Sequence, residues 1–165
     1  MTTVYVSDAM KGTLHSRWAR AVAPQNLATG TLTEEASAPV EWEIPIDGVI
    51  APWLEVMIND INAAARLPRG WDSYNASPLK QKAALHGIEL LEGMCFGGPA
   101  PWISPTPDGM LHLEWSTGAL GVEIEVSEHG DVEVLVEESG NIEEWSTTRL
   151  GDDRLKEILL RLSNH

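Results

Sequence analysis

The feature that most constrains the fold is a change in hydrophobic period, from 3.6 to 2, that begins at Pro101. From there to residue 147, apolar and polar residues alternate one by one within short segments. A period of two is typical of β-strands that bury one face. The alternating apolar residues are Leu111, Leu113, Trp115, Leu120, Val122, Ile124, Val126, Val132, Val134 and Val136.

Turn sequences separate these segments at intervals of about ten residues. Each turn contains a glycine, which adopts the positive φ that tight hairpins need. The turns are Pro107-Asp108-Gly109, Ser116-Thr117-Gly118, Glu128-His129-Gly130 and Glu138-Ser139-Gly140. With a last strand over residues 142–147, the pattern predicts a four-stranded antiparallel β-meander.

Apolar residues at helical spacing predict helices on both sides of this meander. We expect one from Pro52, one after Ser77-Pro78, and a third that Asp152 or Asp153 caps. The predicted fold is therefore α+β, with two or three helices on one face of the meander. This domain covers residues 49–165, and residues 1–48 form an irregular N-terminal arm or a small hairpin. Three tryptophans are expected in or near the core: Trp53, Trp102 and Trp115.

The other face of the sheet should point outward, and it carries carboxylates. Glu114, Glu123, Glu125, Glu133 and Glu137 occupy the polar positions of the alternation. On the last strand, Glu143 and Trp145 join the predicted partner-binding set, and their exact placement depends on the register.

Charge is concentrated in the same segment. The chain has a formal net charge of -14, and residues 108–147 hold eleven acidic residues but no Lys or Arg. Neighbouring carboxylates on one sheet face repel one another, whereas a mixture with Lys would stabilise the sheet. We interpret the acidic face as a surface that awaits cationic groups from a basic protein. The alternative is a solvated face that charge protects from aggregation.

Several classes of function are disfavoured. The negative charge repels nucleic acid and anionic membranes. No run of 18 apolar residues predicts a membrane span, and the N-terminus lacks the pattern of a secretory signal. One cysteine, Cys95, excludes an intramolecular disulfide and fits a reducing compartment. We therefore expect a cytoplasmic protein.

No motif for chemistry stands out. The sequence contains no HExxH pair, no GxSxG elbow and no phosphate-binding loop. His112 and Glu114 share one strand face, but we interpret them as simple neighbours rather than as metal ligands. The sequence thus predicts a non-enzymatic protein with no catalytic residues, no metal and no cofactor.

Two motifs resemble a group of small bacterial and phage proteins. The group shares an L-P-x-G-W-D-x-Y element and, further along, a P-T-x-D-G-x-x-x-L-E-W strand. Here they read Leu67-Pro68-Arg69-Gly70-Trp71-Asp72-Ser73-Tyr74, then Ser77-Pro78, then Pro105-Thr106-Pro107-Asp108-Gly109 and Leu111-x-Leu113-Glu114-Trp115. The similarity covers about residues 54–147 and implies no reaction. Asn75 departs from the pattern, which has Gly after the tyrosine.

The leading hypothesis is an inhibitor that occludes a basic surface on a nuclease or nucleic-acid-binding complex. It could be a phage anti-defence protein, such as an anti-CRISPR, or an antitoxin or immunity protein. Nucleic-acid mimicry, wedging and induced dimerisation are all open, as is the oligomeric state. The alternative is a small enzyme or ligand-binding domain that uses Trp71, Asp72 and Tyr74, although a rigid connector also explains these residues.

Overall fold

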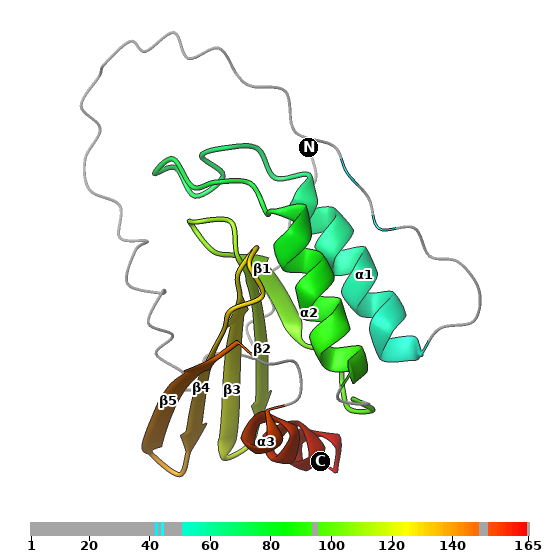
Figure 1. Ribbon diagram of the computed structural model, residues 1–165. Coiled ribbons are helices and arrows are strands. Elements are labelled where there is room, and N and C mark those ends of the chain that lie inside the picture. Colours follow the sequence, from blue (N-terminus) through cyan, green and yellow to red (C-terminus); the bar gives the residue numbers. More distant parts are fainter. Residues whose placement is uncertain (1–41, 43, 45–50, 94–95, 149–151, 165) are drawn as a thin grey trace, which may run out of the picture. The chain divides into compact units, whose positions relative to one another are not determined.

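The structure, a computed structural model, describes residues 42, 44, 51–93, 96–148 and 152–164 (Figure 1). All of these residues belong to the same compact unit of the chain. The predicted arm or hairpin of residues 1–48 lies outside the described residues, apart from Trp42 and Ile44. Both of these side chains pack against the core.

The sheet contains five antiparallel strands in the order of the sequence. They are β1 (Trp102–Pro105), β2 (Leu111–Thr117), β3 (Leu120–Val126), β4 (Val132–Glu138) and β5 (Asn141–Thr147). The α+β class and the meander are confirmed, but the predicted number of four strands is wrong. The missed strand β1 is short, does not alternate and ends in proline, which is tolerated because β1 lies at the edge of the sheet.

Short hairpin turns set the strand register. Two residues, Gly118 and Ala119, join β2 to β3, and Ser139 and Gly140 join β4 to β5. Gly118 has a φ of 62°, and the φ values of Ser139 and Gly140 are 52° and 84°. Two-residue loops with positive φ match the twist of paired strands and leave little freedom for slippage. The predicted turns are therefore confirmed.

Three helices complete the fold: α1 (Pro52–Ala65), α2 (Gln81–Gly93) and α3 (Asp153–Ser163). Helix α1 begins at Pro52, as predicted. Helix α3 has the predicted cap, because the Asp152 carboxylate accepts a hydrogen bond from the Leu155 amide at 3.0 Å. Helix α2 begins later than expected, and Ser77 is not its cap. The Ser77 amide instead donates to the Pro107 carbonyl in the β1–β2 turn, at 2.7 Å.

The core lies between the apolar face of the sheet and the three helices, and α1 and α2 run side by side (Figure 1). Rings of Trp53, Phe96 and Trp115 meet edge to face, with centroids 5.5 and 5.6 Å apart. Trp115 also donates from its indole nitrogen to the Pro99 carbonyl at 2.9 Å. The core placement of Trp53 and Trp115 is confirmed. That of Trp102 is wrong, since this side chain is 56% exposed on the other face.

The loop between α1 and α2 is held by its own hydrogen bonds. One carboxylate oxygen of Asp72 accepts from the amides of Tyr74 and Ala76, at 2.8 and 2.9 Å. These backbone hydrogen bonds lower the pKa of Asp72. The Trp71 indole donates to the Ser77 carbonyl at 3.2 Å. Asn75 has a φ of 80°, a conformation that glycine adopts freely and asparagine tolerates better than most residues. This explains why asparagine can stand where the resemblance expects glycine.

The segment that follows the first motif, Ser77 to Lys80, contacts the second motif at the turn between β1 and β2. Besides the Ser77 bond, the Lys80 amide donates to the Gly109 carbonyl at 2.9 Å. A Cβ atom on Gly109 would lie 2.5 Å from the Pro78 carbonyl oxygen. The turn can therefore approach the start of α2 only because residue 109 has no side chain, and the contact fixes α2 against the sheet.

A pair of glycine substitutions tests this contact. Gly118→Ala should lower the free energy of unfolding by about 1 kcal/mol, because its φ is positive but its Cβ would meet open space. Gly109→Ala should lower it by about 2–4 kcal/mol, because the clash with Pro78 adds to the same strain. Urea unfolding curves measure both. Equal losses would show that the close approach at residue 109 does not matter.

Candidate functional site

The strand register places one set of polar positions on the face of the sheet opposite the core. We call this set the acidic face. It contains Trp102, Ser104, His112, Glu114, Ser116, Gly121, Glu123, Glu125, Glu133, Leu135, Glu137, Ile142, Glu144 and Ser146. Two like-charged pairs stand directly opposite each other in the ladders, Glu114 with Glu123 and Glu125 with Glu133.

The structure brings together five of the seven predicted partner-binding residues. Glu114, Glu123, Glu125, Glu133 and Glu137 all lie on the acidic face. The other two, Glu143 and Trp145, lie on the face of the core, because Trp145 pairs with Val134 and Glu143 with Val136.

Trp145 packs against the hydrophobic core, and α3 supplies a partner for both residues. The guanidinium of Arg154 lies over the Trp145 ring and forms an ion pair with Glu143. Glu143 and Trp145 therefore help to attach α3 to the sheet.

The centre of the acidic face is buried, which corrects the expectation that its glutamates all point into solvent. The exposed fractions of Glu123, Glu125 and His112 are only 4%, 5% and 5%. Glu114 and Glu137 are half-buried, and Glu133 is exposed. The accessible carboxylates therefore flank a desolvated centre on β2 and β3.

His112 lies between two carboxylates at this centre. Its Nδ1 atom is 3.6 Å from Glu125, and its Nε2 atom is 3.8 Å from Glu114. Burial opposes the charged imidazolium, but the contacts with Glu114 and Glu125 and the charges of Glu123 and Glu125 outweigh it. Together they raise the pKa of His112 to about 9. His112 is therefore a buried cation at neutral pH, and it offsets part of the repulsion among the glutamates.

Desolvation by burial raises the pKa of Glu123, and the nearby charges of Glu114, Glu125 and Glu137 act in the same direction. The charge of His112 opposes this shift. Burial and these like charges therefore disfavour the ionised form of Glu123.

The cluster retains unused hydrogen-bonding capacity. Among the residues that the structure describes, the two carboxylate oxygens of Glu125 have no hydrogen-bond partner. The same holds for the Nδ1 atom of His112, and all three atoms are buried. The separations of 3.6 and 3.8 Å are longer than an ordinary hydrogen bond, so attraction between charges holds the cluster. Buried carboxylate oxygens of this kind favour a cationic donor.

The arrangement is poorly suited to general-base catalysis. Ser104, His112 and Glu125 are direct neighbours across three strands, the residue types of a nucleophilic triad. However, both imidazole nitrogens face carboxylates, and a pKa of about 9 keeps the ring protonated at neutral pH. In the described part of the chain, no group of three or more His, Cys, Asp or Glu side chains is arranged to hold a metal ion.

Apolar side chains stand at both edges of the acidic face. Trp102 lies on β1, and Ile142 on β5 is 66% exposed directly opposite Glu137. Sequence reasoning missed Trp102, Ile142 and the role of His112. A register derived from the two-residue turn at Gly118 would have placed His112 opposite Glu125.

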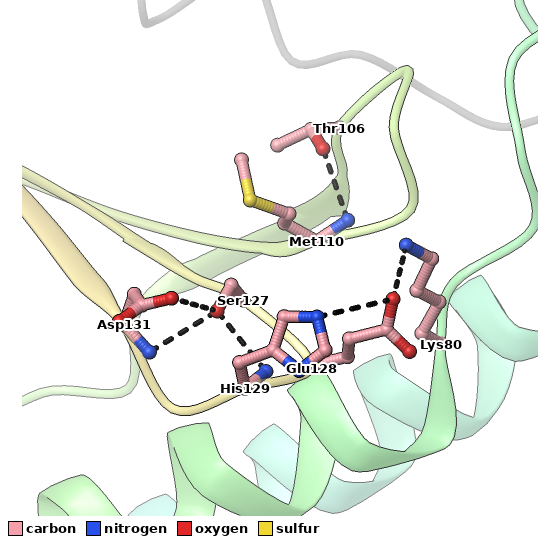
Figure 2. A network of polar contacts seen from close by, with 7 residues as sticks. All are labelled: Lys80, Thr106, Met110, Ser127, Glu128, His129 and Asp131. Atoms are coloured by element: carbon pink, nitrogen blue, oxygen red, sulfur yellow. Dashed lines mark hydrogen bonds and ion pairs between the residues drawn. The ribbon is translucent and has the colours of Figure 1, made fainter. Parts of the chain in front are cut away.

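Several basic side chains of the described residues pair outside the acidic face. Lys80 forms an ion pair with Glu128 at 2.8 Å (Figure 2), beside a turn in which the Ser127 hydroxyl accepts from the amides of His129 and Asp131 at 3.1 Å. Two further ion pairs join α3 to the strands: Arg154 with Glu143, and Arg161 with Glu138. Within the described residues, no ion pair joins a Lys or Arg to Glu114, Glu123, Glu125, Glu133 or Glu137.

Comparisons with protein-family models, curated proteins and solved structures found no match for this chain. None of the helices in the described segments is both long and apolar enough to cross a membrane.

The charge state of His112 can be tested through stability. A folded-state pKa of about 9, above the ordinary 6.5, stabilises the fold fully below pH 6.5. This contribution, about 3 kcal/mol at most, is lost as the pH rises towards 9. Urea unfolding from pH 6 to pH 9 should show the loss in the wild type, and His112→Gln should remove most of it.

An NMR titration of the imidazole gives the direct reading. Glu125→Gln should lower the pKa of His112, because it removes one of the two carboxylates beside the ring. A His112 that titrates near its ordinary value in the wild-type protein would contradict the buried ion cluster.

Proposed function

We propose that this chain is a non-catalytic, cytoplasmic, protein-binding inhibitor. Its acidic face engages a basic surface on a nucleic-acid-handling protein and keeps that surface from its nucleic acid. The observation that carries the proposal is the set of six glutamates on one face of one sheet. In the described residues, no Lys or Arg forms an ion pair with Glu114, Glu123, Glu125, Glu133 or Glu137.

The accessible part of the face has the composition of a protein interface. Glu133 is exposed and Glu137 half-buried, and Ile142 and Leu135 provide apolar surface beside them. Interfaces of this kind combine an apolar anchor with a polar rim, and the anchor contributes most of the binding energy. In this proposal, Glu133 and Glu137 make direct contacts, while Glu123 and Glu125 act through their charge and by holding His112.

Electrostatics favours a cationic partner. Each pair of opposed carboxylates destabilises the sheet by roughly a few tenths of a kcal/mol in water, so cations that lie between them gain attraction and relieve repulsion. Such complementarity accelerates association and depends strongly on salt. A partner that binds nucleic acid presents clustered Lys and Arg, which matches this surface.

Two biological roles use the same surface. A phage anti-defence protein, such as an anti-CRISPR, would block a host nuclease complex, and an antitoxin or immunity protein would block a toxic nuclease. Both need a compact acidic chain that covers a nucleic-acid channel. Identification of the captured partner separates them.

The alternative, an enzyme or ligand-binding domain at Trp71, Asp72 and Tyr74, receives less support. Trp71 donates to Ser77, and Asp72 receives two backbone amides, so these groups already stabilise the connector. Those contacts favour a structural role for the loop over a binding pocket.

A capture experiment with matched charge variants tests the proposal. Tagged protein at low salt should retain a basic, nucleic-acid-binding protein from host lysate, and high salt should release it. The double variant Glu133→Gln/Glu137→Gln should weaken this binding at least tenfold, because it removes two of the accessible carboxylates.

The control is Glu55→Gln/Glu92→Gln, which removes the same charge from exposed positions on α1 and α2. It should bind nearly as well as the wild type. If the two double variants bind equally, the interaction depends on net charge or on another surface, and the proposed function is wrong. Thermal stabilisation by a metabolite, without protein capture, would favour the ligand-binding alternative.

A further inference from the structure

The sheet already binds one arginine by means of a tryptophan and a glutamate. On the face of the core, the guanidinium carbon of Arg154 lies 3.9 Å from the centroid of the Trp145 ring. The same guanidinium forms an ion pair with Glu143, two residues along strand β5. The indole covers one flat side of the cation while the carboxylate binds its edge, an arrangement suited to the planar guanidinium.

The acidic face carries a second pair of the same residue types. Trp102 on β1 stands directly opposite Glu114 on β2. Trp102 is 56% exposed, and the side chain of Glu114 is 23% exposed. In the described part of the chain, no ion pair or cation–π contact joins either residue to a Lys or Arg. This second pair therefore has the residue types of the first, but the cation beside it in the described structure is the buried His112 rather than an arginine.

The neighbours of this pair also point to a cationic ligand. The ring of His112 meets Trp102 edge to face, with centroids 6.3 Å apart. Beyond it lies Glu125, which is buried and whose two carboxylate oxygens have no hydrogen-bond partner among the described residues. Glu114 and Glu125 lie 3.8 and 3.6 Å from the His112 ring and the charge of Glu123 also acts on it, so carboxyl groups outnumber the histidine at this site.

We propose that Trp102 and Glu114 form the docking point for an arginine side chain of the basic partner. The inference rests on the proposed function and specifies which cation the acidic face recognises. Arginine fits better than lysine, because a guanidinium stacks on an indole and can donate two parallel hydrogen bonds to a carboxylate. The ammonium of lysine is not planar and cannot donate two parallel hydrogen bonds to one carboxylate.

The test compares two peptides of equal charge, nona-arginine and nona-lysine, by isothermal titration calorimetry at low salt. The wild type should bind nona-arginine about tenfold more tightly, as expected for one desolvated cation–π contact. Trp102→Leu should abolish most of this preference and leave the affinity for nona-lysine nearly unchanged. Because Trp102 is largely exposed, the variant should fold, which its urea unfolding midpoint checks.

A second pair of variants distinguishes the effect of the carboxylate beside Trp102 from the effect of the total charge of the acidic face. Glu114→Gln should reduce the preference for nona-arginine over nona-lysine. Glu137→Gln removes one charge from the same face and should lower the affinity for both peptides by the same factor. In wild-type protein, nona-arginine should shift the NMR signal of the Trp102 indole N–H.

The outcomes distinguish the inference from the proposed function. If both peptides bind with equal affinity and Trp102→Leu changes neither, the arginine site is wrong while the acidic surface stands. If neither peptide binds at low salt, the proposed function fails together with the inference.

Discussion

The register of strands β2 to β5 is the constraint on which the rest of the structure depends. Two-residue turns at Gly118 and at Ser139 leave the strands little freedom to slide, and a slip of one residue would move every apolar side chain to the wrong face. The same register that builds the core therefore also sets six glutamates together on the opposite face. Residues 108–147, which form most of this face, contain no Lys or Arg that could offset its charge.

Burial divides the acidic face into two functional parts. At the centre, Glu123 and Glu125 are desolvated, and His112 is held protonated between Glu125 and Glu114. Compared with apolar side chains of the same volume, such a cluster adds little to stability, because desolvation opposes the attraction between its charges. Around it, Glu133, Ile142 and Trp102 remain accessible. The buried centre contributes electrostatic attraction for a basic partner. The accessible residues around it can contact that partner directly.

The sequence predicts the elements of the fold well, because they follow local rules. Alternation predicts β2, β3 and β4, glycines mark the turns, and Asp152 marks the start of α3. Strand β1 carries no such signal. Its four residues end in proline and do not alternate between apolar and polar, so in the sequence they cannot be told from a short loop. Its absence from the prediction also explains the error on Trp102, whose place on the acidic face follows from pairing with β2.

The site was less predictable, because burial is a tertiary property. Alternation places Glu123 and Glu125 on the polar face, but it does not show that this face is desolvated at its centre. The position of Glu143 and Trp145 could have been deduced, since the turn at Ser139 pairs Trp145 with Val134. The most direct test of the account is a structure of this chain bound to the basic protein that it captures. The account predicts Lys and Arg of the partner against Glu133, Glu137 and Trp102; a partner bound to the helices, with the acidic face left in solvent, would contradict it.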